Sequence, residues 1–268
     1  MSENYLNRGD APFSPEIWEK IDGAVIETAK GQLSARKLLH TEGPYGLGMK
    51  SLPGPDSVAA EDSGITISAS RVIPVAELRG EFSIGARDIA TFEKSGVQFD
   101  LSPAVKAAMN ISKMEDDLLL NGSKALGVEG LLNAKGVQTL KLKPWEAVGS
   151  MVENIITAVT KLDNAGLHGP YSLGLSAELY NLMFRRSERG FSTEMQDIAA
   201  IVTDGIVKLP ALKSGGVLIA SGINFASIVL GQDLMVGFVG PSGRGYDFTI
   251  SETIALRLRV PEAVCILS

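Results

Sequence analysis

Cysteine and histidine are both scarce in this sequence, and their scarcity limits the chemistry that the chain can carry. The single cysteine, Cys265, cannot form a disulfide within the chain, and its apolar neighbours predict a buried structural thiol rather than a nucleophile. The two histidines, His40 and His168, are far apart in the sequence and lack nearby cysteine or acidic ligand patterns. We therefore expect no metal site and no conventional Ser–His–Asp triad.

Long apolar runs and basic blocks are also missing. No run of about 18 apolar residues is present, so no membrane span is expected. The opening residues, MSENYLNRGD, lack the apolar region of a signal peptide. The net charge of −6 and the lack of a Lys/Arg-rich block argue against nucleic-acid binding. Together with the lone cysteine, these features predict a cytoplasmic protein that has neither a membrane nor a nucleic acid as its partner.

Three short motifs resemble catalytic or cofactor-binding patterns only superficially. Gly240–Gly243 lacks the full G-x-S-x-G form of a serine nucleophile, and its flanking strands favour a β-turn. The glycines from Gly43 to Gly48 do not have the spacing of a phosphate-binding loop. Glu115, Asp116 and Asp117 point in different directions around a helix, which favours a solvated face over a metal site. We expect no catalytic residue, no bound metal and no cofactor.

The sequence does contain a long amphipathic helix and enough apolar residues, 45% of the chain, for a large core. Residues 102–121 have Ser102 as a candidate N-cap, Pro103 at the first helical position and Gly122 as the stop. The face expected to enter the core repeats at helical spacing and consists of Ala104, Ala107, Ile111, Met114 and Leu118. Such a helix, roughly 27 Å long, predicts the spine of a domain.

Further elements surround this helix in the sequence. Helices are predicted from Pro15 to about Gly31 and from Pro144 to Ala165. The segment Gly46–Gly64 is rich in Gly, Pro, Ser and Asp, and is expected to be a loop. Residues 65–69 and 76–84 alternate between apolar and polar, and predict a two-stranded antiparallel ribbon whose edges need covering. Because strands dominate the end of the chain, the order predicts an α+β architecture with one domain inserted in another.

Several motifs, in one order along almost the whole chain, resemble those of a single family. They are Arg36-Lys37, Glu42-Gly43-Pro44-Tyr45-Gly46, Pro74-Val75-Ala76-Glu77-Leu78-Arg79, Asp100-Leu101-Ser102, Glu115-Asp116 with Asn121-Gly122, Gly127-Val128-Glu129-Gly130-Leu131-Leu132, Gly169-Pro170-Tyr171, Leu230-Gly231-Gln232-Asp233-Leu234 and Pro261-Glu262-Ala263. The family is that of the encapsulins, bacterial and archaeal nanocompartment shell proteins once described as linocin-type bacteriocins. The ordered set is highly specific, although no single motif is.

The resemblance implies the α+β fold that encapsulins share with tailed-phage major capsid proteins, the HK97-type fold. This fold has a peripheral domain with a spine helix, an extended loop and an axial domain. The implied boundaries are 1–46 for the N-terminal arm and helix of the peripheral domain, 47–80 for the extended loop, 81–130 for the peripheral domain with the spine helix, 131–225 for the axial domain, and 226–268 for the strands that return to the peripheral domain.

The resemblance also implies a function, that of a shell protein and not an enzyme. Copies of the chain would assemble into a closed icosahedral shell of about sixty subunits or more. The enclosed cargo enzyme would be a ferritin-like protein or a dye-decolourising peroxidase, for iron storage or defence against oxidative stress, and would carry a short C-terminal docking peptide. That peptide would bind an apolar groove drawing on Phe13, Ile17, Arg36, Leu234, Val236 and Phe238.

The resemblance finally places residues 185–190 at the five-fold pore of the shell. The loop consists of Arg185, Arg186, Ser187, Glu188, Arg189 and Gly190, and its arginines predict a ring that attracts anions. The alternative for this loop is an exposed, soluble loop tip. Two other functions stay open for the chain. One is a prophage major capsid protein, although such proteins usually begin with a long charged helical segment that is not seen here. The other is a hydrolase, with Ser242 as the residue to test.

Overall fold

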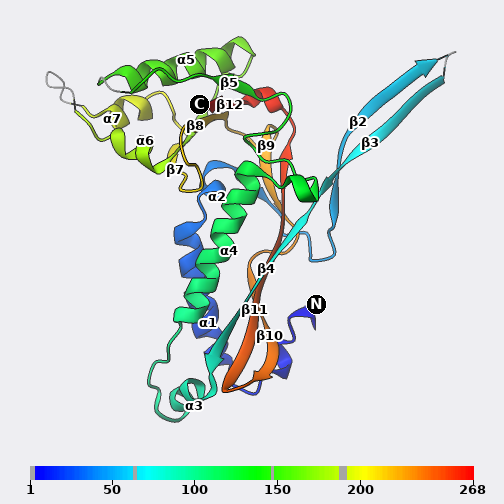
Figure 1. Ribbon diagram of the computed structural model, residues 1–268, viewed down its shortest axis with the longest axis vertical. Helices are drawn as coiled ribbons and strands as arrows, with labels where there is room; N and C mark the ends of the chain where they lie inside the picture. Colours follow the sequence, from blue (N-terminus) through cyan, green and yellow to red (C-terminus); the bar gives the residue numbers. More distant parts are fainter. Residues whose placement is uncertain (1–3, 63–64, 146–147, 187–191) are drawn as a thin grey trace. The chain divides into compact units, whose positions relative to one another are not determined.

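The computed structural model describes residues 4–62, 65–145, 148–186 and 192–268 (Figure 1). The chain divides into two compact units, each made of three segments of the sequence. Unit 1 comprises Met1–Leu33, Gly43–Glu115 and Leu230–Ala255, and unit 2 comprises Ser34–Glu42, Asp116–Val229 and Leu256–Ser268. The boundary falls within two long elements, the helix α4 (Ser102–Asn121) and the strand β11 (Gly245–Leu258).

Unit 1 is built on a sheet whose central strand is β11. This strand pairs in antiparallel fashion with β10 (Met235–Ser242) on one side and with β4 (Ala76–Gly85) on the other. Helices α1 (Pro15–Gln32) and α4 pack on the apolar face of the sheet. The core contains Ile17 and Ile21 of α1, Ala104, Ala108 and Ile111 of α4, and Phe82, Val236, Phe238 and Phe248 of the strands. The helix α3 (Ala86–Ser95) follows β4 and buries Ile89 in the same core.

The helix predicted for residues 102–121 is confirmed in its bounds, but its buried face is different from the predicted one. Ala104 and Ile111 are buried as expected, whereas Met114 is 56% exposed, so its assignment to the core was wrong. Ala108 and Leu119 take the core positions instead, one residue further along the helix. Ser102, predicted as the N-cap, lies within the helix instead. Its N–H donates to the Asp100 carboxylate at 2.8 Å.

Two of the three acidic residues of α4, Glu115 and Asp116, are not on a solvated face, so the expectation is corrected for these two, whereas Asp117 is exposed as expected. Glu115 and Asp116 are 0% and 4% exposed. The Asp116 carboxylate, in unit 2, accepts the backbone N–H groups of Ser34 and Ala35, at 3.0 and 2.8 Å, and the Ser34 hydroxyl. These groups lie at the start of the short helix α2 (Ala35–Leu38), whose first N–H groups have no partner within the helix. A buried carboxylate is tolerated here because it caps that helix.

A two-stranded ribbon projects from unit 1, but it is made of different strands from those predicted. The strand β2 (Ser51–Asp62) pairs in antiparallel fashion with β3 (Ile65–Pro74), so most of the expected loop at 46–64 is a strand. The pairing shifts between Pro53 and Asp56, which accommodates prolines that cannot donate to the ladder. The second predicted strand, β4, pairs with β11 in the main sheet instead.

Unit 2 contains a mixed sheet in the order β5, β12, β8, β6, β7. These strands are β5 (Gln138–Leu140), β12 (Val264–Leu267), β8 (Gly216–Ala220), β6 (Tyr171–Leu175) and β7 (Gly205–Lys208). Every residue of β6 and β8 is buried, as expected of central strands. The helix α5 (Ser150–Asn164) contributes Met151, Ile155, Ala158 and Leu162 to the core, and α6 (Ala177–Leu182) and α7 (Glu194–Ala199) follow β6.

The last strand of the chain lies in unit 2, which differs from the expected grouping of residues 226–268 with the peripheral domain. β12 pairs with β8 in antiparallel fashion and with β5 in parallel. Cys265 on this strand is fully buried, as predicted, and burial raises the pKa of its thiol. Unit 2 also contains β1 (His40–Glu42), which pairs in parallel with β9 (Ala226–Leu230). The range 131–225, predicted as one domain, lies within unit 2.

Gly122 ends α4 as predicted, and a close backbone contact explains the glycine at position 130. Gly122 has a φ of 67°, in the left-handed region that glycine adopts without strain. A Cβ atom on Gly130 would lie 2.3 Å from the backbone nitrogen of Gly122. Unit 2 also contains two 3₁₀ helices. They are η3 (Lys124–Leu126), in the turn after α4, and η4 (Pro261–Ala263), near the end of the chain.

Candidate assembly, cargo and pore surfaces

The segment before α1, predicted as an N-terminal arm, folds back on unit 1. It forms the 3₁₀ helices η1 (Asn4–Leu6) and η2 (Arg8–Asp10), and Leu6 is buried. The Arg8 guanidinium lies 4.0 Å from the centre of the Trp18 ring and pairs with the Asp22 carboxylate at 2.5 Å. Phe13 then enters a cluster of aromatic rings, 5.4 Å from Tyr246 between ring centres. Contacts within the chain are therefore sufficient to order this segment.

The structure brings together most of the residues predicted for the cargo groove, but it buries three of them. Ile17, Val236 and Phe238 are 0%, 1% and 6% exposed, because they belong to the core that the helices and the sheet share. In this structure all three are core residues, and Phe238 also lines the cleft described below. Phe13 and Leu234 pack against the same core and remain half-buried, so their outer surfaces are accessible.

The sixth groove residue, Arg36, belongs to unit 2, where it is half-buried on α2. The other five residues belong to unit 1. The chain enters unit 2 at Ser34, directly after α1. Because Arg36 follows α1 so closely, the sequence does not indicate that it belongs to another unit.

A cleft that the sequence did not predict lies at the N-terminal segment of unit 1. It has a volume of about 190 Å³. Its lining is mostly polar, with Tyr5, Asn7, Arg79, Gln232 and Ser251 among its residues, and its apolar part includes Phe238. Of the six residues predicted for the cargo groove, Phe238 is the one that lines this cleft.

The loop predicted to line a pore begins at a residue that is already committed to an ion pair. Arg185 pairs with the Glu194 carboxylate at 3.1 Å and donates to the carbonyl of Trp145 at 2.7 Å. Its side chain is 26% exposed and that of Glu194 only 2%. Arg185 therefore neutralises a buried acid within its own chain.

Arg186, in contrast, is exposed, and its backbone forms a bridge with Thr193 on the returning side of the loop. Thr193 and Gln196 form a reciprocal capping box at the start of α7. The predicted residues Ser187, Glu188, Arg189 and Gly190 lie outside the described residues.

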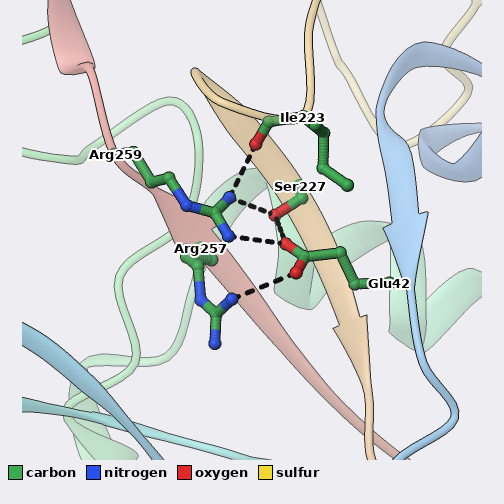
Figure 2. A network of polar contacts seen from close by, with 5 residues as sticks. All are labelled: Glu42, Ile223, Ser227, Arg257 and Arg259. Atoms are coloured by element: carbon green, nitrogen blue, oxygen red, sulfur yellow. Dashed lines mark hydrogen bonds and ion pairs between the residues drawn. The ribbon is translucent and has the colours of Figure 1, made fainter.

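A polar network in unit 2 joins β1, β9 and the end of β11 (Figure 2). The Glu42 carboxylate pairs with Arg257 at 3.1 Å and with Arg259 at 2.9 Å, and accepts a hydrogen bond from Ser227. Arg259 also donates to Ser227 and to the carbonyl of Ile223, at 2.9 and 2.6 Å. Burial raises the pKa of Glu42, but the hydrogen bonds and the two guanidinium charges outweigh it, so the pKa is lowered below 4.5.

Ser242, the residue considered for hydrolysis, contacts an acidic side chain on the neighbouring strand. The hydroxyls of Ser83 and Ser242 donate to Asp247, and these hydrogen bonds lower the pKa of its carboxyl group. A carboxylate with a lowered pKa is a poor general base. In the part of the chain that the structure describes, no group of three or more His, Cys, Asp or Glu side chains is placed to hold a metal.

None of the helices formed by the described residues is both long and apolar enough to cross a lipid bilayer.

Comparison with solved structures identifies the fold. The chain is similar to the virus-like particle of Pyrococcus furiosus, with a TM-score of 0.76 and 23% identity over 94% of this chain and 100% of that one. It is also similar to the capsid of the Myoviridae phage XM1, with a TM-score of 0.63 and 15% identity over 87% and 90% of the two chains. The predicted HK97-type capsid fold is therefore confirmed.

Sequence comparison then identifies the family. The chain belongs to the encapsulin family, because residues 3–255 match the family model described as "Encapsulating protein for peroxidase". It is 30% identical to the diheme-cytochrome-encapsulin shell fusion protein of Kuenenia stuttgartiensis, over 95% of this chain and 73% of that protein. It is 28% identical to the type 1 encapsulin shell protein EncA of Myxococcus xanthus, over 98% and 96% of the two chains. The chain is a shell-forming protein, as the sequence motifs predicted.

Proposed function

We propose that copies of this chain form a closed icosahedral shell of about sixty subunits or more around a cargo enzyme. The observation that carries the proposal is the β2–β3 ribbon, since Ile65, Ile67 and Val72 on it are 70%, 61% and 61% exposed. Two strands with exposed apolar residues are not stable as a free extension in water. A neighbouring copy that covers the ribbon would remove this cost, and repetition of such a contact closes a shell.

The ribbon's role is tested by adding charge to its apolar face. Ile65 and Ile67 alternate along β3 and so share one face. The double variant Ile65→Asp, Ile67→Asp should remain folded by circular dichroism but elute as small oligomers in size-exclusion chromatography. The matched variant Ile65→Val, Ile67→Val keeps the face apolar and should assemble as the parent does. Closed shells of the aspartate variant, seen by electron microscopy, would contradict the proposal.

We further propose that the cargo is a ferritin-like protein or a dye-decolourising peroxidase, held by a short C-terminal peptide. The family description names a peroxidase, and Phe13 and Leu234 offer accessible apolar surface above the core residues Ile17, Val236 and Phe238. Each aliphatic side chain that the peptide buries there contributes about 1.5–3 kcal/mol, and an oligomeric cargo multiplies the effect through avidity. Arg36 would contribute to peptide binding as the sequence resemblance implies.

Cargo binding is tested with the Leu234→Glu variant, whose charge would oppose an apolar anchor. Shells of the variant and the parent are purified from the cells that produce the cargo, and the enclosed protein is measured by haem absorbance and by iron content. The variant should retain the shell and lose most of the cargo. A parental cargo load in Leu234→Glu shells would show that the peptide binds elsewhere.

In this proposal the chain itself has no catalytic role, and iron storage or peroxide removal belongs to the cargo. The loop at residues 185–190 would line a five-fold pore and attract anionic solutes through its arginines. The lone, buried Cys265 is compatible with assembly in the reducing cytoplasm.

A further inference from the structure

Glu194 is a buried carboxylate at the start of α7, and its partners come from three segments of unit 2. Its Oε2 atom lies 3.1 Å from Arg185 Nη2, and its Oε1 atom accepts the backbone N–H of Gly149 at 2.8 Å. The other branch of the Arg185 guanidinium donates to the carbonyl of Trp145 at 2.7 Å. We call Trp145, Gly149, Arg185 and Glu194 the anchor cluster. It ties the start of α5 to both ends of the segment between α6 and α7.

Backbone hydrogen bonds hold the same two ends together. The N–H of Glu194 donates to the carbonyl of Arg185 at 3.3 Å, and the N–H of Met195 donates to the carbonyl of Met183 at 2.9 Å. The charge of Glu194 is buried, so it is stabilised only while Arg185 stays beside it. Arg185 is therefore not available to interact with a passing solute.

We propose that Arg185 and Glu194 are a positioning pair that fixes both ends of the pore loop to the start of α5, and that the charge selectivity of the pore begins at Arg186. The proposal rests on the proposed function, in which this loop lines a pore. Two arginines against one glutamate then leave one net positive charge per copy over residues 186–190. The attraction for anions is accordingly weaker than three arginines would give.

The geometry explains why the position needs an arginine and not merely a positive charge. The planar guanidinium presents separate N–H groups to the Trp145 carbonyl and to the Glu194 carboxylate at the same time. A lysine ammonium at the end of a flexible stem would keep the charge but lose this two-pronged contact. The conservative variant Arg185→Lys thus separates positioning from charge.

The first measurement is hydrogen exchange by mass spectrometry on intact shells, which does not depend on a pore. Arg185→Lys and Glu194→Ala should each speed exchange in the peptides that contain Gly149 and Met195, roughly tenfold or more. Arg186→Lys, at the neighbouring exposed position, should leave both peptides unchanged. Parental exchange rates in Arg185→Lys shells would overturn the positioning role, and this conservative variant decides the question even if Glu194→Ala fails to assemble.

The second measurement is solute entry. Fluorescein-labelled dextran is trapped during reassembly, and its quenching by iodide, an anion, is compared with quenching by neutral acrylamide. Arg185→Lys and Arg185→Gln should change both rates by the same factor, whereas Arg186→Gln should lower the iodide rate relative to acrylamide. If Arg185→Gln lowers only the iodide rate while Arg185→Lys does not, Arg185 is a pore charge and the proposal is wrong. If Arg186→Gln leaves the ratio unchanged, it is the pore function that fails.

Discussion

Replacement of Glu42 by glutamine should destabilise unit 2 substantially. The Glu42 side chain is 10% exposed and lies between Arg257 and Arg259, which are 20% and 33% exposed. Removing one partner of a buried ion pair typically costs about 3–5 kcal/mol, because the other charge is left without compensation. Partial exposure of the two arginines and the retained amide oxygen reduce this cost, so we expect about 2–3 kcal/mol. For a chain of this size, such a loss lowers Tm by roughly 5–10 °C.

The pH dependence of this effect has a definite sign. The pKa of Glu42 is lower in the folded chain than its ordinary value of 4.5, so the unfolded chain binds this proton more readily. The contribution of Glu42 is therefore complete above pH 4.5, and it disappears as the pH falls through the lowered pKa of the folded chain. The gap in Tm between the parent and Glu42→Gln should be widest at neutral pH and narrow below pH 4.5.

Differential scanning calorimetry of intact shells at several pH values measures both effects. The exposed Glu81 on β4 provides the control, since Glu81→Gln removes the same charge outside the network and should change Tm by less than about 2 °C. If Glu42→Gln melts with the parent at neutral pH, or if the gap between them widens in acid, the stabilising role assigned to the network is wrong.

Two further predictions concern α4, and urea unfolding of the intact protein checks both. Asp116→Asn removes the charged acceptor of the Ser34 and Ala35 amides and should lower the free energy of unfolding by about 1–3 kcal/mol. Asp117→Asn, at an exposed position, should lower it by less than about 0.5 kcal/mol. Equal losses would contradict the capping role of Asp116. Leu119→Ala in the core should cost about 2–5 kcal/mol and Met114→Ala less than about 1 kcal/mol, and the reverse order would restore the face predicted from the sequence.

The sequence was sufficient to predict the bounds of α1 and α4, but not the start of α5, which was predicted at Pro144 and lies at Ser150, nor the face that α4 buries. In α4, two overlapping apolar stripes lie about one residue apart, and periodicity favours the one that contains Met114 and Leu118. The structure buries Ala108 and Leu119 in place of Ala107 and Leu118, and it also buries polar residues, Asp116 in α4 and Asn154 in α5. Asp116 binds the backbone of Ser34, 82 positions away, and Asn154 accepts the N–H of Lys143 at 3.0 Å. Periodicity within one helix carries no information about such distant partners.

The ribbon and the pore loop also depend on contacts that the sequence alone does not show. Pro53, Gly54 and Pro55 indicate a loop by composition, yet the strand β2 includes them because its pairing shifts around them. Arg185 is one of three nearby arginines in the sequence, and only its contact with Glu194 distinguishes it from the exposed Arg186. The family and the HK97-type fold could be predicted because they depend on many ordered motifs rather than on any one contact.

The central claim, that this chain closes into a shell, is tested most directly by electron microscopy of the purified protein. The account predicts hollow, closed particles of uniform diameter with icosahedral symmetry, together with their loss in the Ile65→Asp, Ile67→Asp variant. Purified chains that remain monomeric, or that form open filaments or sheets under the same conditions, would contradict it.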